Sequence, residues 1–374
     1  MQPPSRRRLT LGAVSGLAAC LSLASCKDQR VPPPGVGGNF APPSPTTTVS
    51  TAFDKPRKPT GPLTIRMITN NSSSFWAAME QGMKAAAKEV DVASAERLTP
   101  SGSSPTHNDQ KVTFEQAVAA NVDGIGVSPI EATVFAPVIN SAIDKGIPVI
   151  TFDSDSETSK RLVYLGTNNY EAGKRAGEQA VRLLPNGGKF IAFVGNMTAQ
   201  NARDRYRGFL DAVKGHNIEP LQDPFQDKAD KTGAAYNNVN DAITRYGDKI
   251  NLMLGIWSYN GPAIVDVVQQ RKVRDRTKIV CFDGDAKTLS NLANGLVDAT
   301  VVQKPFEFGR LGTKLLYLIN RKGLTAALAE LKPELDRLGM KLDGNKIDTG
   351  VVVVTPANAK PFLQELKEKG LEST

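Results

Sequence analysis

A chain of 374 residues, 40% of them hydrophobic, is long enough for two domains of ordinary size, each with its own core. The formal net charge of +8 is concentrated at the start, because residues 1–61 contain eight Lys/Arg and two Asp/Glu, a net charge of +6. The remainder is nearly neutral, which removes the electrostatic argument for a nucleic-acid partner, and none is expected.

Residues 1–25 predict an export signal. A basic stretch at residues 5–8 (SRRR) precedes an apolar segment at 9–23 that is too short to span a bilayer comfortably. The ending at residues 23–26 (LASC) resembles a bacterial lipobox. This resemblance implies cleavage before Cys26, lipidation of that cysteine, and a mature protein tethered to a bacterial membrane, in the periplasm or at the cell surface. An ordinary secretory signal with an incidental cysteine is the alternative, and both the Sec and the twin-arginine routes stay open.

Residues 26–61 predict an extended, disordered spacer. The segment is rich in Pro, Gly, Ser and Thr, as in residues 32–34 (PPP) and 42–45 (PPSP), and it has little apolar surface to bury. Such a tether would give the folded body reach from the membrane.

The cysteines and histidines argue against two kinds of site. Removal of Cys20 with the signal and lipidation of Cys26 leave Cys281 alone, and one cysteine makes no internal disulfide. His107 and His216 lie far apart in the sequence and are expected at the surface. We therefore expect no metal site, and no motif requires a cofactor.

From residue 62 onward, short β-branched runs alternate with amphipathic stretches of helical length. Strands are predicted at 63–68, 124–127, 148–152, 163–165, 190–194, 252–256, 279–282 and 299–302. Helices are predicted at 75–90, 111–120, 132–145, 170–184, 202–214, 232–245, 262–271 and 306–320. Apolar strands that alternate with helices are typical of parallel sheets covered on both faces. There are too many strands for one small sheet, so the pattern predicts an α/β fold with two doubly wound domains.

Ligands of such sheets bind beyond the carboxyl ends of the strands, so the residues that follow each strand are informative. After the first strand comes the run 70–76 (NNSSSFW), where a dinucleotide-binding enzyme would have a glycine-rich loop. Phe75 and Trp76 would block the approach of a pyrophosphate. Later strand ends carry Asp153, the run 257–260 (WSYN), Asp283 and Gln303.

Four motifs in this order and spacing resemble the ribose-type periplasmic sugar-binding proteins over residues 62–355. They are residues 147–153 (IPVITFD), 202–209 (ARDRYRGF), 281–284 (CFDG) and 299–305 (ATVVQKP). The resemblance implies the venus-flytrap fold of a type I periplasmic binding protein, in which three crossings join two α/β domains. It also implies a monomer that delivers a small-molecule sugar or polyol to the permease of an ABC transporter.

The implied domains are discontinuous in sequence. Residues 62–166 with 304–345 would form the N-terminal domain, residues 167–303 with 346–358 the C-terminal domain, and residues 359–374 a C-terminal tail. Ligand bound between two such domains would favour a closed arrangement by contacting both.

The resemblance also assigns ligand-binding roles, and no catalytic ones. The positions that match the family pattern are Phe75, Trp76, Asp153, Arg205, Asp283 and Gln303. Ser258 lies about where the family has an asparagine, but Trp257, Tyr259 and Asn260 crowd the same turn, and the sequence does not choose among them. Asn71 and Ser73 complete the set of candidates.

These residue types suit a sugar, because an aromatic ring contacts its C–H face while carboxylate, amide and guanidinium groups bind its hydroxyls by charge-assisted hydrogen bonds. One departure limits the choice of substrate. The ribose type has an arginine after the aspartate that matches Asp153, and this chain has Ser154. A hydroxyl does not reproduce the fork of an arginine, which argues against ribose itself and leaves another pentose, a hexose or a polyol.

Each candidate also has a purely structural interpretation. The two aspartates could cap the helices that follow them, the aromatic pair could pack in the core, and Arg205 could be a solvated helix charge. Arg203 and Arg207 are expected to be such charges. Asp155 is expected to be a helix cap or an exposed turn residue, and Asp227 a loop residue.

Three function classes compete on this sequence. The first is a solute-binding lipoprotein for import. The second is a ligand-sensing ectodomain or autoinducer-type binder that feeds a membrane sensor kinase, which would use the same fold. The third, an enzyme, is disfavoured because the sequence has no nucleophile elbow, P-loop or cluster of metal ligands, and paired carboxylates bind hydroxyls without doing chemistry. A repressor of the same fold would need an N-terminal helix-turn-helix in place of the signal.

Overall fold

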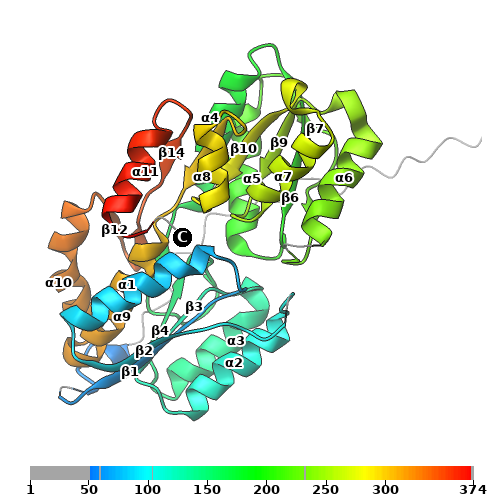
Figure 1. Ribbon diagram of the computed structural model, residues 1–374. Helices are drawn as coiled ribbons and strands as arrows, with labels where there is room; N and C mark the ends of the chain where they lie inside the picture. Colours follow the sequence, from blue (N-terminus) through cyan, green and yellow to red (C-terminus); the bar gives the residue numbers. More distant parts are fainter. Residues whose placement is uncertain (1–50, 59, 103, 231–232, 372–374) are drawn as a thin grey trace, which may run out of the picture. The chain divides into compact units, whose positions relative to one another are not determined.

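The computed structural model describes residues 51–58, 60–102, 104–230 and 233–371 (Figure 1). The predicted signal, the lipidation site at Cys26 and most of the spacer lie outside the described residues. Residues 47–374 belong to one unit, which contains both sheets of the protein. No helix among the residues described is long and apolar enough to cross a bilayer.

The first sheet has the strand order β12-β13-β5-β4-β3-β1-β2. Its strands are β1 (Leu63–Ile68), β2 (Val92–Leu98), β3 (Gly124–Val127), β4 (Val149–Phe152), β5 (Tyr164–Gly166), β12 (Lys341–Asp343) and β13 (Lys346–Asp348). Neighbouring strands are parallel, except that β12 and β13 form an antiparallel pair at one edge.

Helices cover both faces of this sheet (Figure 1). On one face, α1 (Phe75–Glu89) packs against α9 (Pro305–Lys322), and α10 (Leu324–Arg337) packs on α9 and β12. On the other face lie α2 (His107–Ala119) and α3 (Ala132–Asp144). The sheet and these helices make the first domain.

The second sheet has the order β14-β11-β10-β9-β6-β7, with β8 also paired to β6. Its strands are β6 (Gly188–Val194), β7 (Ile218–Pro220), β8 (Phe225–Gln226), β9 (Leu252–Gly255), β10 (Lys278–Phe282), β11 (Ala299–Val302) and β14 (Val352–Val354). All pairs are parallel except β11 with β14. The helices of this second domain are α4 (Asn169–Leu183), α5 (Gln200–Val213), α6 (Ala234–Tyr246), α7 (Asn260–Gln270), α8 (Ala286–Ala293) and α11 (Ala359–Glu368), with short 3-10 turns at Gly247–Lys249 and Arg274–Arg276.

The predicted α/β fold with two doubly wound domains is confirmed. All eight predicted strands and all eight predicted helices are present, with ends displaced by a few residues. The central strands β3, β4, β9 and β11 are buried at every residue, as expected of parallel strands with helices on both faces.

The elements that the sequence did not predict lie mostly at edges. Strand β2 alternates polar and apolar residues that are half-buried or exposed, so no apolar run marks it. Strands β12, β13 and β14 have three residues each, too few to show a period. Helix α11 lies in the segment predicted as a C-terminal tail, and Phe362 and Leu366 pack it against the second core.

The chain passes between the sheets after β5, after β11 and between β13 and β14. The first two crossings fall where they were predicted, near Gly166 and Gln303. The third corrects the predicted boundary, because residues 346–348 form β13 and still pair with β5 of the first sheet. The crossing therefore lies between Asp348 and Val352.

Glycines let the helices that support the cleft pack closely. A Cβ atom on Gly82 of α1 would lie 1.9 Å from the carbonyl oxygen of Phe306, and one on Gly309 of α9 would lie 1.9 Å from that of Met79. Any side chain at either position would push α1 and α9 apart. The first turn of α1, which carries Phe75 and Trp76, is thus held against α9.

Candidate functional site

A polar cavity lies where the carboxyl ends of the strands of both sheets face each other, and its volume is about 30 Å³. Most of the predicted site residues line it: Asn71, Ser73, Phe75, Trp76, Asp153, Arg205, Trp257, Ser258 and Asp283. The others that line it are Asn70, Asn201 and Tyr259. Of the predicted residues, Asn260 and Gln303 do not line it.

Arg205 is the centre of the site and is 1% exposed, so it is not a solvated helix charge. Its Nε donates to Asn169 Oδ1 at 3.0 Å and its Nη1 donates to the carbonyl oxygen of Ile256 at 3.0 Å. The guanidinium lies 4.7 Å from the ring centre of Phe282. These contacts from α4, from the residue after β9 and from β10 hold the group in place, while Nη2 has no hydrogen-bond partner within the described chain.

Two aspartates from different domains flank this arginine. Arg205 Nη2 lies 3.8 Å from Asp153 Oδ1, and Arg205 Nη1 lies 3.6 Å from Asp283 Oδ2. Both separations exceed hydrogen-bond length, so the carboxylates are near the cation without being saturated by it. Each aspartate directly follows a strand, β4 or β10, and each has a positive φ, 58° for Asp153 and 70° for Asp283. Backbone strain of this kind gathers at ligand sites.

Burial raises the pKa values of both carboxyl groups. It raises the pKa of Asp153 to about 6, although the charge of Arg205 acts in the opposite direction. Burial also raises the pKa of Asp283, again against Arg205. Hydrogen bonds partly offset the cost of the charges: Ser128 Oγ donates to Asp153 Oδ2 at 3.0 Å, and Gln303 Nε2 donates to Asp283 Oδ1 at 2.9 Å.

Asn201 is a site residue that the sequence analysis missed. Its Nδ2 donates to Asp153 Oδ2 at 2.9 Å, and its Oδ1 accepts from Trp257 Nε1 at 3.3 Å. It therefore joins the second domain to the aspartate of the first. It opens α5 just before the motif that carries Arg205, so the rule that strand ends carry ligand residues could have found it.

The aromatic pair has a double role. Phe75 and Trp76 both line the cavity, yet both are also part of the first core, where Trp76 is 1% exposed. Trp76 Nε1 donates to Asn71 Oδ1 at 3.2 Å, and Asn71 Oδ1 also accepts from the backbone of Ser73. These bonds hold the loop between β1 and α1 in shape, so Asn71 and Ser73 support the aromatic wall.

In the turn after β9, some residues line the cavity and one stabilises the turn. Trp257, Ser258 and Tyr259 line the cavity. Asn260 instead turns away, accepting from the backbone of Trp257 at 3.0 Å and donating to Asp227 Oδ2 at 3.0 Å. Asp227, expected to be a loop residue, is buried and also accepts from the Tyr259 hydroxyl at 2.6 Å. Burial raises its pKa to about 7.

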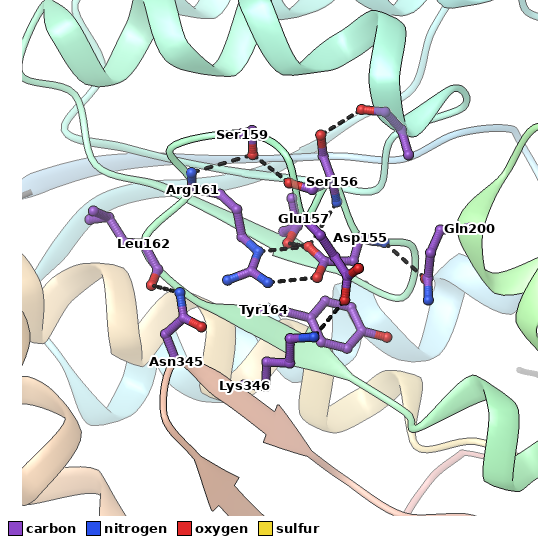
Figure 2. Close-up of polar contacts among 12 residues, drawn as sticks. Asp155, Ser156, Glu157, Ser159, Arg161, Leu162, Tyr164, Gln200, Asn345 and Lys346 are labelled. Atoms are coloured by element: carbon purple, nitrogen blue, oxygen red, sulfur yellow. Dashed lines mark hydrogen bonds and ion pairs between the residues drawn. The ribbon is translucent and has the colours of Figure 1, made fainter. Parts of the chain in front are cut away.

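A second correction concerns Asp155, which was expected to be a helix cap or an exposed turn residue. It is buried and receives two hydrogen bonds from Arg161, from Nε at 2.6 Å and from Nη2 at 2.6 Å (Figure 2). Its backbone N–H donates to Gln200 Oε1 at 3.3 Å, a contact between the domains. Asp155 thus stabilises the turn that contains Asp153.

Over the ranges that the structure describes, no group of three His, Cys, Asp or Glu side chains could hold an ion. Cys281 is buried in β10, and burial raises the pKa of its thiol. Polar groups that converge from two domains on a small cavity suit the capture of a hydroxyl-rich molecule.

Comparisons with known proteins agree with this fold and site. The family model described as periplasmic binding protein domain matches residues 66–323. The chain belongs to this family.

Two curated proteins are similar to this chain. A xylose/arabinose-binding protein of Sulfolobus acidocaldarius is 23% identical over 69% of this chain and 62% of the relative. A ribose import binding protein of Bacillus subtilis is 22% identical over 66% of this chain and 78% of the relative. The chain thus spans less than two thirds of the first of these relatives.

Solved structures give closer likenesses. The glucose-galactose binding protein GanP of Geobacillus stearothermophilus is 26% identical, with a TM-score of 0.67 over 80% of this chain and 99% of that one. A chain of the XylFII–LytSN complex is 30% identical, with a TM-score of 0.67 over the same shares of the two chains. The type I periplasmic binding protein fold implied by the sequence is therefore confirmed.

Proposed function

We propose that this chain is an extracytoplasmic solute-binding lipoprotein that captures a sugar, either a pentose, a hexose or a polyol, and delivers it to an ABC transporter. One observation carries the proposal: Arg205 lies between Asp153 and Asp283, which come from different domains and are not saturated by it. Hydroxyl groups can donate to both carboxylates and accept from the arginine. The relatives named above bind xylose or arabinose, ribose, and glucose or galactose.

Binding would add hydrogen bonds to side chains that now lie beyond hydrogen-bond distance of one another. A volume of about 30 Å³ holds about two water molecules, too few for a sugar ring, so the site must widen to admit one. Ligand hydroxyls would donate to Asp153 beside Asn201 and give Arg205 Nη2 a partner at hydrogen-bond distance. Because the ligand would touch both domains, it would then favour the closed arrangement.

The test is a thermal-shift screen of the purified chain against D-ribose, D-xylose, L-arabinose, D-galactose, D-glucose, ribitol and xylitol. At least one of them should raise the unfolding temperature by an amount that grows with concentration. Small-angle scattering should show compaction with the same compound. A panel that produces no shift at millimolar concentration contradicts the proposal.

The lipid anchor is proposed from residues 23–26 alone, which lie outside the described part of the chain. Cys26→Ser should release the protein from the membrane fraction and leave its sugar affinity unchanged, because the proline-rich spacer separates the anchor from the folded body. Mass spectrometry should find a diacylated N-terminus on the native protein. An unacylated N-terminus would rule out the anchor.

A second candidate has one observation in its favour. XylFII, which is 29% identical to this chain, is also found in a XylFII–LytSN complex, so a protein of this fold can pair with a second protein. In that case ligand closure would be read by a membrane sensor. Deletion of the gene separates the two roles: loss of sugar uptake supports import, whereas intact uptake with a lost transcriptional response supports sensing.

A further inference from the structure

A second, larger cavity adjoins the polar one and has a volume of about 400 Å³. The two cavities share Phe75 and Ser258 as lining residues, so they are adjacent at these side chains. Both domains contribute to the larger one, which lies between α1 and α9 on one side and α11 and β14 on the other. Its lining includes Phe75 and Ala78 of α1, Phe306 of α9, Val352 of β14, and Phe362 and Leu366 of α11.

The larger cavity is suited to an apolar group. Most of its lining side chains are hydrocarbon, and the charges at its edge include both signs. An apolar cavity of about 150 Å³ accepts benzene, so 400 Å³ is ample for one aromatic ring or a short alkyl chain. Pockets of about 300–1,000 Å³ with a hydrophobic lining and a few polar groups are those that hold small molecules.

Two residues of this lining each carry a buried polar atom. Gln303 is 4% exposed and Ser258 is 5% exposed. Gln303 Oε1 and Ser258 Oγ have no hydrogen-bond partner among the residues described. A buried polar atom without a partner is unfavourable, and a ligand would offset this cost by supplying one. Gln303 connects the two cavities, because it lines the larger one and its Nε2 donates to Asp283, which lines the polar one.

We propose that the ligand is a sugar that carries an apolar substituent, such as an aryl or alkyl glycoside. This inference rests on the proposed sugar-binding function. The sugar ring would lie in the polar cleft with Asp153, Arg205 and Asp283, and the substituent would enter the larger cavity past Phe75. The oxygen that links the two parts would accept from Ser258 Oγ, and a neighbouring hydroxyl would donate to Gln303 Oε1.

Calorimetry with matched probes tests this inference on the full chain. The probes are D-xylose and D-galactose, each as the free sugar and as its methyl and phenyl glycosides in both anomeric forms. For the sugar that binds, one phenyl glycoside should bind at least tenfold more tightly than the matching methyl glycoside, because the phenyl ring leaves water for the apolar cavity.

A pair of neighbouring substitutions provides the control. Ala78→Leu places a larger side chain in the apolar cavity and should abolish the advantage of the phenyl group while the free sugar binds as before. Ala77→Leu makes the same change one position away, at a residue that lines neither cavity, and should preserve the advantage. Phenyl and methyl glycosides of equal affinity would overturn the inference, as would an advantage that survives Ala78→Leu.

Two further outcomes separate this inference from the proposed function. Free sugars that bind while every phenyl glycoside is rejected would refute the inference and leave sugar binding intact. Phenol that binds equally well with and without sugar would show an independent apolar site, which also refutes it. If no sugar and no glycoside binds, the proposed function fails and the inference fails with it.

Discussion

Asp153 and Asp155 lie in the same turn after β4, both are buried and both face an arginine, yet their surroundings differ. Asp155 receives two hydrogen bonds of 2.6 Å from Arg161, and it also accepts from Thr151 Oγ1 at 2.6 Å and from the backbone of Ser156 at 2.7 Å (Figure 2). Asp153 lies 3.8 Å from its arginine, Arg205, which it shares with the aspartate of the other domain.

The difference distinguishes a structural ion pair from a candidate binding site. The carboxylate of Asp155 is saturated by groups of its own domain, so nothing is left for a ligand to supply. The cluster around Arg205 keeps long separations, a donor without a partner and carboxyls whose pKa values are raised. Residue type and burial are alike in the two clusters, and only the completeness of hydrogen bonding separates them.

The largest expected effect follows from breaking the saturated pair. Arg161→Met should lower the free energy of unfolding by about 3–5 kcal/mol, because Asp155 would be left as a buried charge without its cation. Chemical denaturation of the ligand-free protein measures the loss. Arg207→Met, at an exposed position of α5, is the control and should change stability by about 0.5 kcal/mol at most. A loss under about 1 kcal/mol in Arg161→Met would contradict a structural role for the pair.

Substitutions in the cluster around Arg205 should weaken ligand binding. Arg205→Ala and Asp283→Ala should each weaken sugar affinity roughly tenfold to a few hundredfold, because each leaves ligand hydroxyls without a charged partner. Calorimetry measures the change, and circular dichroism should show that the fold survives. Arg207→Ala should bind normally. Near-native affinity in both site variants would mean that the assigned residues do not hold the ligand.

The pH dependence sharpens the same distinction. Because the pKa of Asp153 in the folded protein is about 6, above the ordinary value of 3.8, the folded state retains a proton that the unfolded state releases. The stability contribution of this carboxyl is therefore fully present below about pH 4 and is lost as the pH rises through about 6. The raised pKa values of Asp283 and Asp227 act in the same direction.

Sugar affinity should change in the opposite sense over the same window. Ligand hydroxyls donate to the ionised carboxylate, so affinity should rise between about pH 5 and pH 7, by up to about tenfold per pH unit below the pKa of Asp153. Thermal unfolding and calorimetry at matched pH values measure the two trends. An affinity that does not vary with pH would show that binding does not depend on the ionisation of Asp153, which contradicts its assigned role.

The smallest expected effect concerns Asn201, which links the two domains without carrying charge. Asn201→Ala removes a donor to Asp153 and the acceptor of Trp257 Nε1, and it should weaken sugar binding several-fold, in line with the loss of about 1 kcal/mol for a neutral hydrogen bond. Asn196→Ala, at a half-buried position in the loop before α5, is a matched control. An unchanged affinity would make Asn201 a structural residue.

Much of the fold was predictable because its central elements carry a strong local signal. The four-residue apolar strands β3, β9 and β11 are buried on both faces and form continuous hydrophobic runs, so the sequence predicts them and the helices between them. Edge strands such as β2 alternate exposed and half-buried residues and carry no comparable local signal. Their existence depends on a neighbouring strand.

The sequence likewise predicted some features of the candidate site and missed others. The rule that ligand residues follow strands places Asp153 and Asp283 without any structure, and the resemblance to a known family adds Arg205. The sequence did not show that Asp155, two residues on, is a buried carboxylate with a full set of hydrogen bonds, because that depends on which groups the fold brings to it. Only the tertiary structure put Arg161 in full contact with one aspartate and held Arg205 at a distance from the other. Only the tertiary structure brought residues of α1 and α11 to the same apolar cavity, next to the polar one. The sequence determines local periodicity and residue chemistry. The number of hydrogen bonds that a buried carboxylate receives, and the volume of a cavity, arise from contacts between segments far apart in the chain.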